Sequence, residues 1–163
     1  MNLMQSLKEN DSICLGLRAQ NWSEAIKLSV KPLIDSGAVT EAYYHAILEL
    51  TEKYGPYYIL MPGMAMPHAR PEAGVNRTAF SLISLTEPVT FSDGKEVSVL
   101  LTLAAISSEI HTSVAIPQIV ALFELENSIE RLVAAKHKEE IFKMLEESKS
   151  NPFLEELNLD REM

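Results

Sequence analysis

Apolar residues in this chain recur at two different spacings. Towards both ends of the sequence they recur at intervals of three and four residues, which is typical of amphipathic helices. In the middle they form short runs bounded by Gly, Pro or polar residues, which is typical of strands. The pattern therefore predicts helices on both sides of a set of strands.

Two helices are expected before the central strands. The first begins after Asn21, a residue type that caps helix N-termini, with Glu24 at the third helical position and Gly37 as its stop. The second begins at Thr40 and ends at the Gly-Pro pair at 55–56. Three later helices are expected over residues 116–125, 128–135 and 139–147.

Four short segments have the composition of strands. They are residues 13–17, 57–60, 79–85 and 97–105. The run at 97–105 is nearly all apolar, which favours a central strand buried on both faces. Helices interleaved with buried strands predict an α/β fold, a layered single domain built around one sheet.

Composition and charge narrow the functional classes. The chain has 163 residues and a net charge of −9, so we expect no binding to nucleic acid, whose phosphates most of this surface would repel. A basic protein partner would be attracted instead. Cys14 is the single cysteine, so no internal disulfide forms. The first ten residues do not resemble a signal peptide, and the apolar runs are too short to span a bilayer. The expected location is the cytoplasm.

His68 is the most informative residue in the chain. It follows an apolar run and Pro67, and Arg70 and Pro71 come directly after it. Because proline fixes its own φ and has no N–H donor, this histidine is expected to lie in a rigid loop at the end of a strand. Its imidazole would then be presented from a defined place.

His111 is the second candidate. It lies between the predicted buried strand and the helix that contains Pro117. Binding sites in α/β sheets gather beyond the carboxyl ends of strands, and a helix N-terminus there offers N–H groups to an anion. His45 and His137 lie in helical or charged stretches and are expected on the surface.

A neutral imidazole is a good nucleophile near pH 7 and can accept a phosphoryl group. Phosphoryl transfer requires in-line positioning, together with cations and N–H donors around the equatorial oxygens. His111, Arg70 and the helix N-terminus could supply these groups to a phosphoryl group on His68.

Two other interpretations of these residues remain open. The Pro-His-x-Arg-Pro segment could be a rigid surface turn in which Arg70 pairs with Glu72. A zinc site has less support, since two histidines lack a third ligand at a suitable spacing. The chain also has no nucleotide-binding motif, so no cofactor is expected and any phosphate must come from another protein.

Residues 62–69, PGMAMPHA, resemble the G-[IV]-A-[IVM]-P-H-[AG] signature of the mannitol/fructose class of EIIA domains in the bacterial phosphotransferase system (PTS EIIA type 2). A second match is His111 followed by the helical run at 116–124. The segments at 55–58, 66–75 and 118–124 are most similar to the ascorbate-specific EIIA component.

The resemblance implies a mixed β-sheet flanked by helices over residues 1–148, followed by an acidic C-terminal tail at 149–163. It implies that His68 takes phosphate from phospho-HPr and passes it to a Cys of an EIIB partner, with the membrane EIIC involved only indirectly. His111 occupies the helper position. The mannitol enzymes also have an Arg in the preceding helix, where this chain has Leu50. Arg70 is the expected substitute.

The function expected is that of a phosphocarrier, a phosphotransferase serving ascorbate uptake. Two alternatives stay open: a regulatory protein whose phosphorylation state controls a binding partner, and a His-dependent hydrolase or metal enzyme. For docking, at least one of Met61, Met64 and Met66 is expected to be solvent-accessible near His68, because Met suits a surface reused by two partners.

Overall fold

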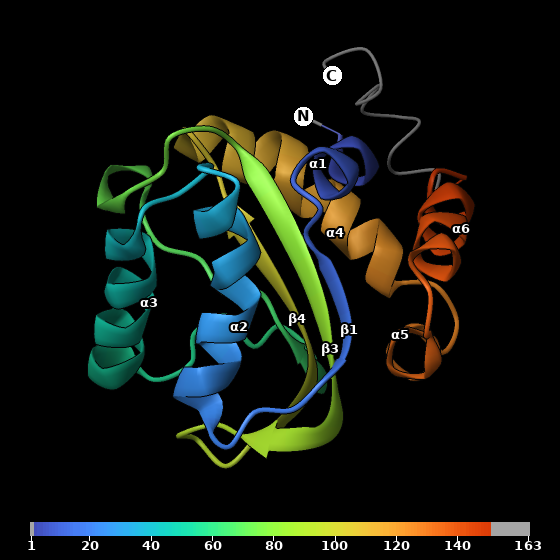
Figure 1. Cartoon of the computed structure of the whole chain (residues 1–163), viewed down its shortest axis with the longest axis horizontal. Coiled ribbons are helices and arrows are strands. Elements are labelled where there is room, and N and C mark those ends of the chain that lie inside the picture. Colours follow the sequence, from blue (N-terminus) through green and yellow to red (C-terminus); the bar gives the residue numbers. More distant parts are fainter. Residues whose placement is uncertain (1, 151–163) are drawn as a thin grey trace.

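The computed structural model describes residues 2–150 and contains one sheet with helices on both faces (Figure 1). The elements are, in chain order, α1 (Leu3–Glu9), β1 (Ile13–Leu17), α2 (Trp22–Asp35), α3 (Glu41–Tyr54), β2 (Gly63–Ala65), the 3-10 turn η1 (Pro71–Ala73), β3 (Ala79–Thr90), β4 (Glu96–Ala104), the π-helical segment η2 (Ile110–Ala115), α4 (Ile116–Phe123), α5 (Ser128–Ala134) and α6 (Lys138–Ser148). The α/β layered fold expected from the sequence is confirmed.

The sheet is mixed, and its strand order is β1-β3-β4-β2. Strands β3 and β4 form an antiparallel hairpin, whereas β1 runs parallel to β3 and β2 runs parallel to β4. As a result, β2 and β4 are neighbours whose carboxyl ends lie at the same end of the sheet. The two segments that follow these strands carry the candidate histidines.

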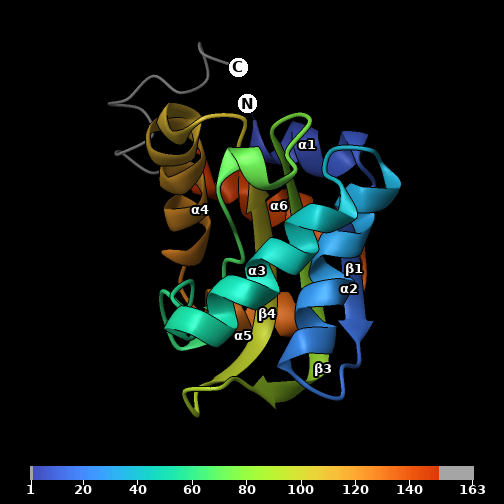
Figure 2. The ribbon, with the colours of Figure 1, turned by 90° about the vertical axis from the view of Figure 1, so that its left-hand side faces the viewer.

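Each face of the sheet packs against its own set of helices. Helices α2 and α3 lie side by side on one face (Figure 2), and α1, α4, α5 and α6 cover the other (Figure 1). Residues of β4 alternate between the two cores: Leu101 and Leu103 pack on the α4 side, while Leu100 and Ala104 pack on the α2 side. Strand β4 is therefore buried on both faces, as its apolar run predicts.

The prediction of a strand at residues 57–60 is wrong. That segment is a turn and an irregular stretch, and the strand of this region is β2, a few residues later. Tyr58 is fully buried, and its hydroxyl forms a hydrogen bond with Thr51 of α3. This residue therefore packs against a helix and does not pair in the sheet. Strand β3 also continues beyond the predicted segment at 79–85.

Helix α1 was not expected from the sequence pattern. It is short, the Asn2 side chain caps it, and Leu3 and Leu7 lie in the core. None of the helices over residues 2–150 is both long and apolar enough to cross a membrane. The acidic tail expected at 149–163 falls almost wholly outside the described residues and stays a prediction.

Candidate active site

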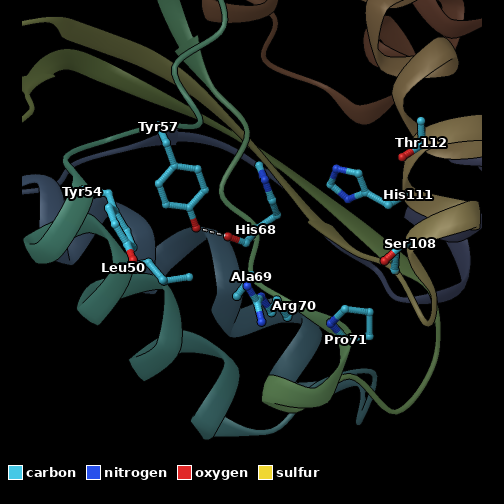
Figure 3. Close-up of a pocket in the computed structure, with 11 residues that line it drawn as sticks. Leu50, Tyr54, Tyr57, His68, Ala69, Arg70, Pro71, Ser108, His111 and Thr112 are labelled. Atoms are coloured by element: carbon cyan, nitrogen blue, oxygen red, sulfur yellow. Dashed lines mark hydrogen bonds between the residues drawn. The ribbon is translucent and has the colours of Figure 1, made fainter.

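His68 and His111 meet at the carboxyl ends of the neighbouring strands β2 and β4 (Figure 3). His68 lies in the loop after β2, and His111 lies in η2 after β4. Their ring centroids are 4.8 Å apart, with the ring planes inclined by 56°. The topology thus brings together the two histidines that the sequence singled out.

A hydrogen bond fixes the tautomer of His68. Its Nδ1 lies 2.8 Å from the carbonyl oxygen of Met66. A carbonyl oxygen only accepts hydrogen bonds, so Nδ1 carries the proton and donates it. The lone pair is then on Nε2, at the far side of the ring from this bond. Since His68 lines an open pocket, Nε2 is the nitrogen available to an incoming group.

Hydrogen bonds from three directions hold the loop around His68. The backbone N–H of Leu103 in β4 donates to the carbonyl of Pro67 at 3.0 Å. The hydroxyl of Tyr43 in α3 donates to the carbonyl of Leu103 at 2.6 Å and accepts the N–H of Ala69 at 3.0 Å. The hydroxyl of Tyr57 donates to the carbonyl of His68 itself (Figure 3). The rigid loop predicted from the prolines is therefore held mainly by tyrosines and strand β4.

His111 projects from the first turns of a helix. Ser107 precedes this helix, and its hydroxyl accepts the backbone N–H of Ile110 at 3.2 Å. The backbone N–H of His111 donates to the Ser107 carbonyl at 3.1 Å, so the N–H groups that favour an anion are those at the very start of the helix, near Ser108. The π-helical winding of η2 is itself common at functional sites.

Burial keeps both imidazoles neutral at pH 7. It lowers the pKa of His68, although the bond to Met66 opposes this shift. It also lowers the pKa of His111, and the neighbouring imidazole of His68 lowers it further. A neutral His68 has a free lone pair and can act as a nucleophile. A neutral His111 adds no positive charge that would repel a second imidazole beside it.

Arg70 lies at the mouth of the same pocket, two residues after His68. Its side chain is exposed, and within residues 2–150 it forms no ion pair, neither with Glu72 nor with another carboxylate. The alternative in which Arg70 and Glu72 stabilise a surface turn is therefore not supported. The guanidinium is available to an anion bound at the histidines.

The pocket has a volume of about 420 Å³. Its lining residues are Leu50, Tyr54, Tyr57, His68, Ala69, Arg70, Pro71, Ala105, Ser108, His111 and Thr112. Leu50 of α3 thus lies in the wall of the pocket, and it presents an apolar side chain there.

The prediction that one of three methionines is solvent-accessible near His68 is wrong. Met64 and Met66 are buried in the core, and Met61 is half-buried beside a different pocket, next to Lys95. Side chains of a strand alternate between core and surface, but both faces of this sheet are covered by helices, so β2 has no exposed face. Two tyrosines, Tyr54 and Tyr57, supply the exposed apolar surface instead.

The other two histidines are exposed, as the sequence predicted. His45 lies on the outer side of α3, and His137 precedes α6, where Glu140 accepts its backbone N–H at 3.0 Å. Within the described part of the chain, no three His, Cys, Asp or Glu side chains gather in a way that could hold a metal ion. The sequence reasoning missed Tyr43 and Tyr57, whose roles depend on contacts between distant segments.

Comparison with known proteins agrees with this geometry. Residues 6–148 match the family model described as phosphoenolpyruvate-dependent sugar phosphotransferase system, EIIA 2. The ascorbate-specific PTS EIIA component of Escherichia coli K12 is 43% identical over 148 residues, which cover 90% of this chain and 96% of the relative.

Two solved structures extend the comparison. A putative PTS IIA from Streptococcus mutans is 74% identical, with a TM-score of 0.94 over 95% of this chain and 99% of the other. The complex of mannitol enzyme IIA with phosphorylated enzyme IIB from Escherichia coli contains a chain that is 28% identical, with a TM-score of 0.71 over 85% of this chain and 95% of the other. The protein therefore belongs to the EIIA type 2 family of the phosphoenolpyruvate-dependent sugar phosphotransferase system, and it is a homologue of the ascorbate-specific EIIA components.

Proposed function

We propose that the protein is a phosphocarrier in which Nε2 of His68 accepts a phosphoryl group from phospho-HPr and passes it to a Cys of an EIIB partner. The observation that carries this proposal is the bond from Nδ1–H of His68 to the carbonyl of Met66. That bond leaves the lone pair on Nε2, the nitrogen that faces an incoming donor.

The two half-reactions balance without a cofactor. In the first, the P–N bond of phospho-HPr breaks as the P–Nε2 bond forms, and the proton on Nδ1 stays in place. The phosphorylated ring is positively charged while Nδ1 keeps its proton, so the Met66 carbonyl stabilises it. In the second, a thiolate of EIIB attacks phosphorus and the P–Nε2 bond breaks, returning His68 to its neutral form.

Groups around the pocket can stabilise the charge on the transferring phosphoryl oxygens. His111 lies beside the acceptor ring, Arg70 is at the mouth of the pocket, and the helix N-terminus near Ser108 offers backbone N–H groups. Preorganised donors of this kind act most strongly in the transition state, when the phosphoryl group is bound to neither partner fully. We assign His111 and Arg70 this role.

The partners follow from the relatives. The mannitol IIA protein forms a complex with phosphorylated IIB, which supports an EIIB acceptor here. The identity to ascorbate-specific EIIA components supports ascorbate as the transported sugar. In this scheme the membrane EIIC is reached only through EIIB, and we propose the cytoplasm as the location of the reaction. We propose residues 1–148 as the EIIA unit; residues 149–163, which follow it in the sequence, are acidic in composition.

The experiment is reconstitution with phosphoenolpyruvate, enzyme I and HPr, followed by intact-mass analysis. We expect a gain of one phosphate that is labile in acid and stable in alkali, as for a phosphohistidine. Phosphorus NMR of the product should show attachment at Nε2 and not Nδ1. Adding the EIIB of an ascorbate system should remove the phosphate from the protein. If the protein is phosphorylated but EIIB cannot remove the phosphate, a regulatory role is favoured. Absence of labelling would refute the proposal.

A further inference from the structure

Tyr57 contacts His68 in two independent ways. Its hydroxyl donates a hydrogen bond to the backbone carbonyl of His68. Its ring also packs perpendicular to the imidazole, with centroids 5.2 Å apart and an interplanar angle of 89°. One side chain therefore constrains both the main chain and the ring of the acceptor histidine.

The imidazole of His68 is flanked on two sides. Figure 3 shows the Tyr57 ring on one side of it and His111 on the other. Leu50, Tyr54 and Tyr57 line the same open pocket as His68, so the imidazole would have space to turn if the contacts with Tyr57 that hold it were weakened. Turning would break the bond from Nδ1 to Met66, and that bond is what sets the tautomer.

The position of Tyr57 is itself fixed. The chain leaves α3 through Gly55, which has a φ of +79°, and the N–H of Tyr57 donates to the Gly55 carbonyl at 2.9 Å. The next residue, Tyr58, is fully buried, and its carbonyl accepts the N–H of Met66 at 2.9 Å. Tyr57 is thus anchored to the same segment that holds the Met66 carbonyl.

The hydroxyl of Tyr57 remains a donor throughout the neutral pH range, because burial raises its pKa to about 12. A hydroxyl has a single proton, and here that proton is used in the bond to the His68 carbonyl. In this geometry the side chain has no proton to give to a phosphoryl oxygen. Its contribution is to geometry and not to proton transfer.

We infer that Tyr57 is a positioning residue that holds the His68 imidazole in the orientation and tautomer needed to accept a phosphoryl group. The inference rests on the proposed role of His68 as the acceptor. The same tyrosine is 38% exposed, so a partner protein could also touch it. The test must therefore separate positioning of His68 from docking.

The variant is Tyr57→Phe, which keeps the ring and removes the hydroxyl. We expect kcat for phosphoryl acceptance to fall about tenfold, because small misplacements of a reacting group are costly, while KM for phospho-HPr stays unchanged. Nitrogen NMR of the His68 imidazole in the unphosphorylated protein should show a smaller fraction of the Nδ1–H tautomer than in the wild type.

Tyr58→Phe is the matched control. It removes the neighbouring hydroxyl, whose partner is Thr51 and not the His68 loop. We expect it to lower the thermal stability while leaving kcat and the tautomer unchanged. Equal losses in the two variants would mean general loosening of the fold and would overturn the inference.

Two further results would also overturn it. One is wild-type kcat and tautomer in Tyr57→Phe, and the other is a rise in KM alone, which would make Tyr57 a docking contact. His68→Ala separates this inference from the proposed function. If that variant is still phosphorylated, the proposed function fails, whereas the tautomer measurement still decides whether Tyr57 orients the imidazole.

Discussion

The rings of His68 and His111 lie 4.8 Å apart, although they come from segments that follow two different strands. At this separation, a phosphoryl group placed on Nε2 of His68, as proposed above, would lie within reach of the second imidazole. The two-histidine mechanism requires that both rings lie within the span of one phosphate. Had they lain on opposite faces of the domain, that mechanism would have failed.

The first prediction concerns the acceptor. His68→Ala should abolish phosphate acceptance from phospho-HPr, because no other imidazole has both a fixed tautomer and access to the pocket. The fold should persist, since truncating a partly exposed side chain typically costs about 1 kcal/mol or less of unfolding free energy. Intact-mass analysis and circular dichroism check the two parts. His45→Ala, on the exposed side of α3, is the control that should label fully.

The second prediction separates the half-reactions. His111→Ala should still accept phosphate but transfer it to EIIB slowly, by about a hundred- to a thousandfold, as when one preorganised donor is removed from a transition state. Rapid-quench measurement of the phosphorylated protein mixed with EIIB checks this. An unchanged transfer rate would remove His111 from the mechanism.

The third prediction concerns the cation. Arg70→Ala should slow both half-reactions, because the guanidinium would contact the same phosphoryl oxygens whichever partner is docked. Arg18→Ala removes an exposed arginine that does not line the pocket, and should slow neither. Single-turnover rates in both directions provide the measurement. Equal effects of the two substitutions would show that only net charge matters.

The fourth prediction uses Leu50, which lies in the pocket wall. In the background of Arg70→Ala, the substitution Leu50→Arg should restore part of the lost transfer rate, because it returns a guanidinium to the pocket from α3. Leu50→Gln in the same background adds a polar group without charge and should restore nothing. The same single-turnover assay decides, and no recovery with Arg would mean that α3 cannot supply the cation in this protein.

The fifth prediction concerns pH. Burial lowers the pKa of both imidazoles, so acceptance of phosphate should be nearly constant above pH 6.5 and fall only at lower pH, as Nε2 of His68 becomes protonated. The unfolded chain binds these protons more readily than the folded chain, so stability should decrease as pH falls below 6.5. The double variant with His68→Ala and His111→Ala should lose less stability over this range in denaturant titrations. If the stability of the wild type and of the double variant depended on pH in the same way, the direction of these pKa shifts would be contradicted.

Sequence alone was sufficient where a local pattern determines structure. The Asn21 cap and the glycines at 37 and 55 located α2 and the end of α3, because these helix ends depend on hydrogen bonds and backbone angles within a few residues. The continuous apolar run identified β4 as a strand buried on both faces, since only such a position removes all its side chains from water. The prolines around His68 indicated a rigid loop after a strand, although tyrosines and strand β4 hold that loop and the strand lies at Gly63–Ala65.

The remaining features were decided by contacts between segments far apart in the sequence. Tyr58, in the run at 57–60, packs against α3 and not in the sheet, and Met64 and Met66 are buried because both sheet faces are covered. The pairing of β2 with β4 places His68 beside His111, and Tyr57 reaches the His68 carbonyl across a turn. A sequence pattern reports which residues avoid water, whereas strand order and side-chain geometry decide which of them meet.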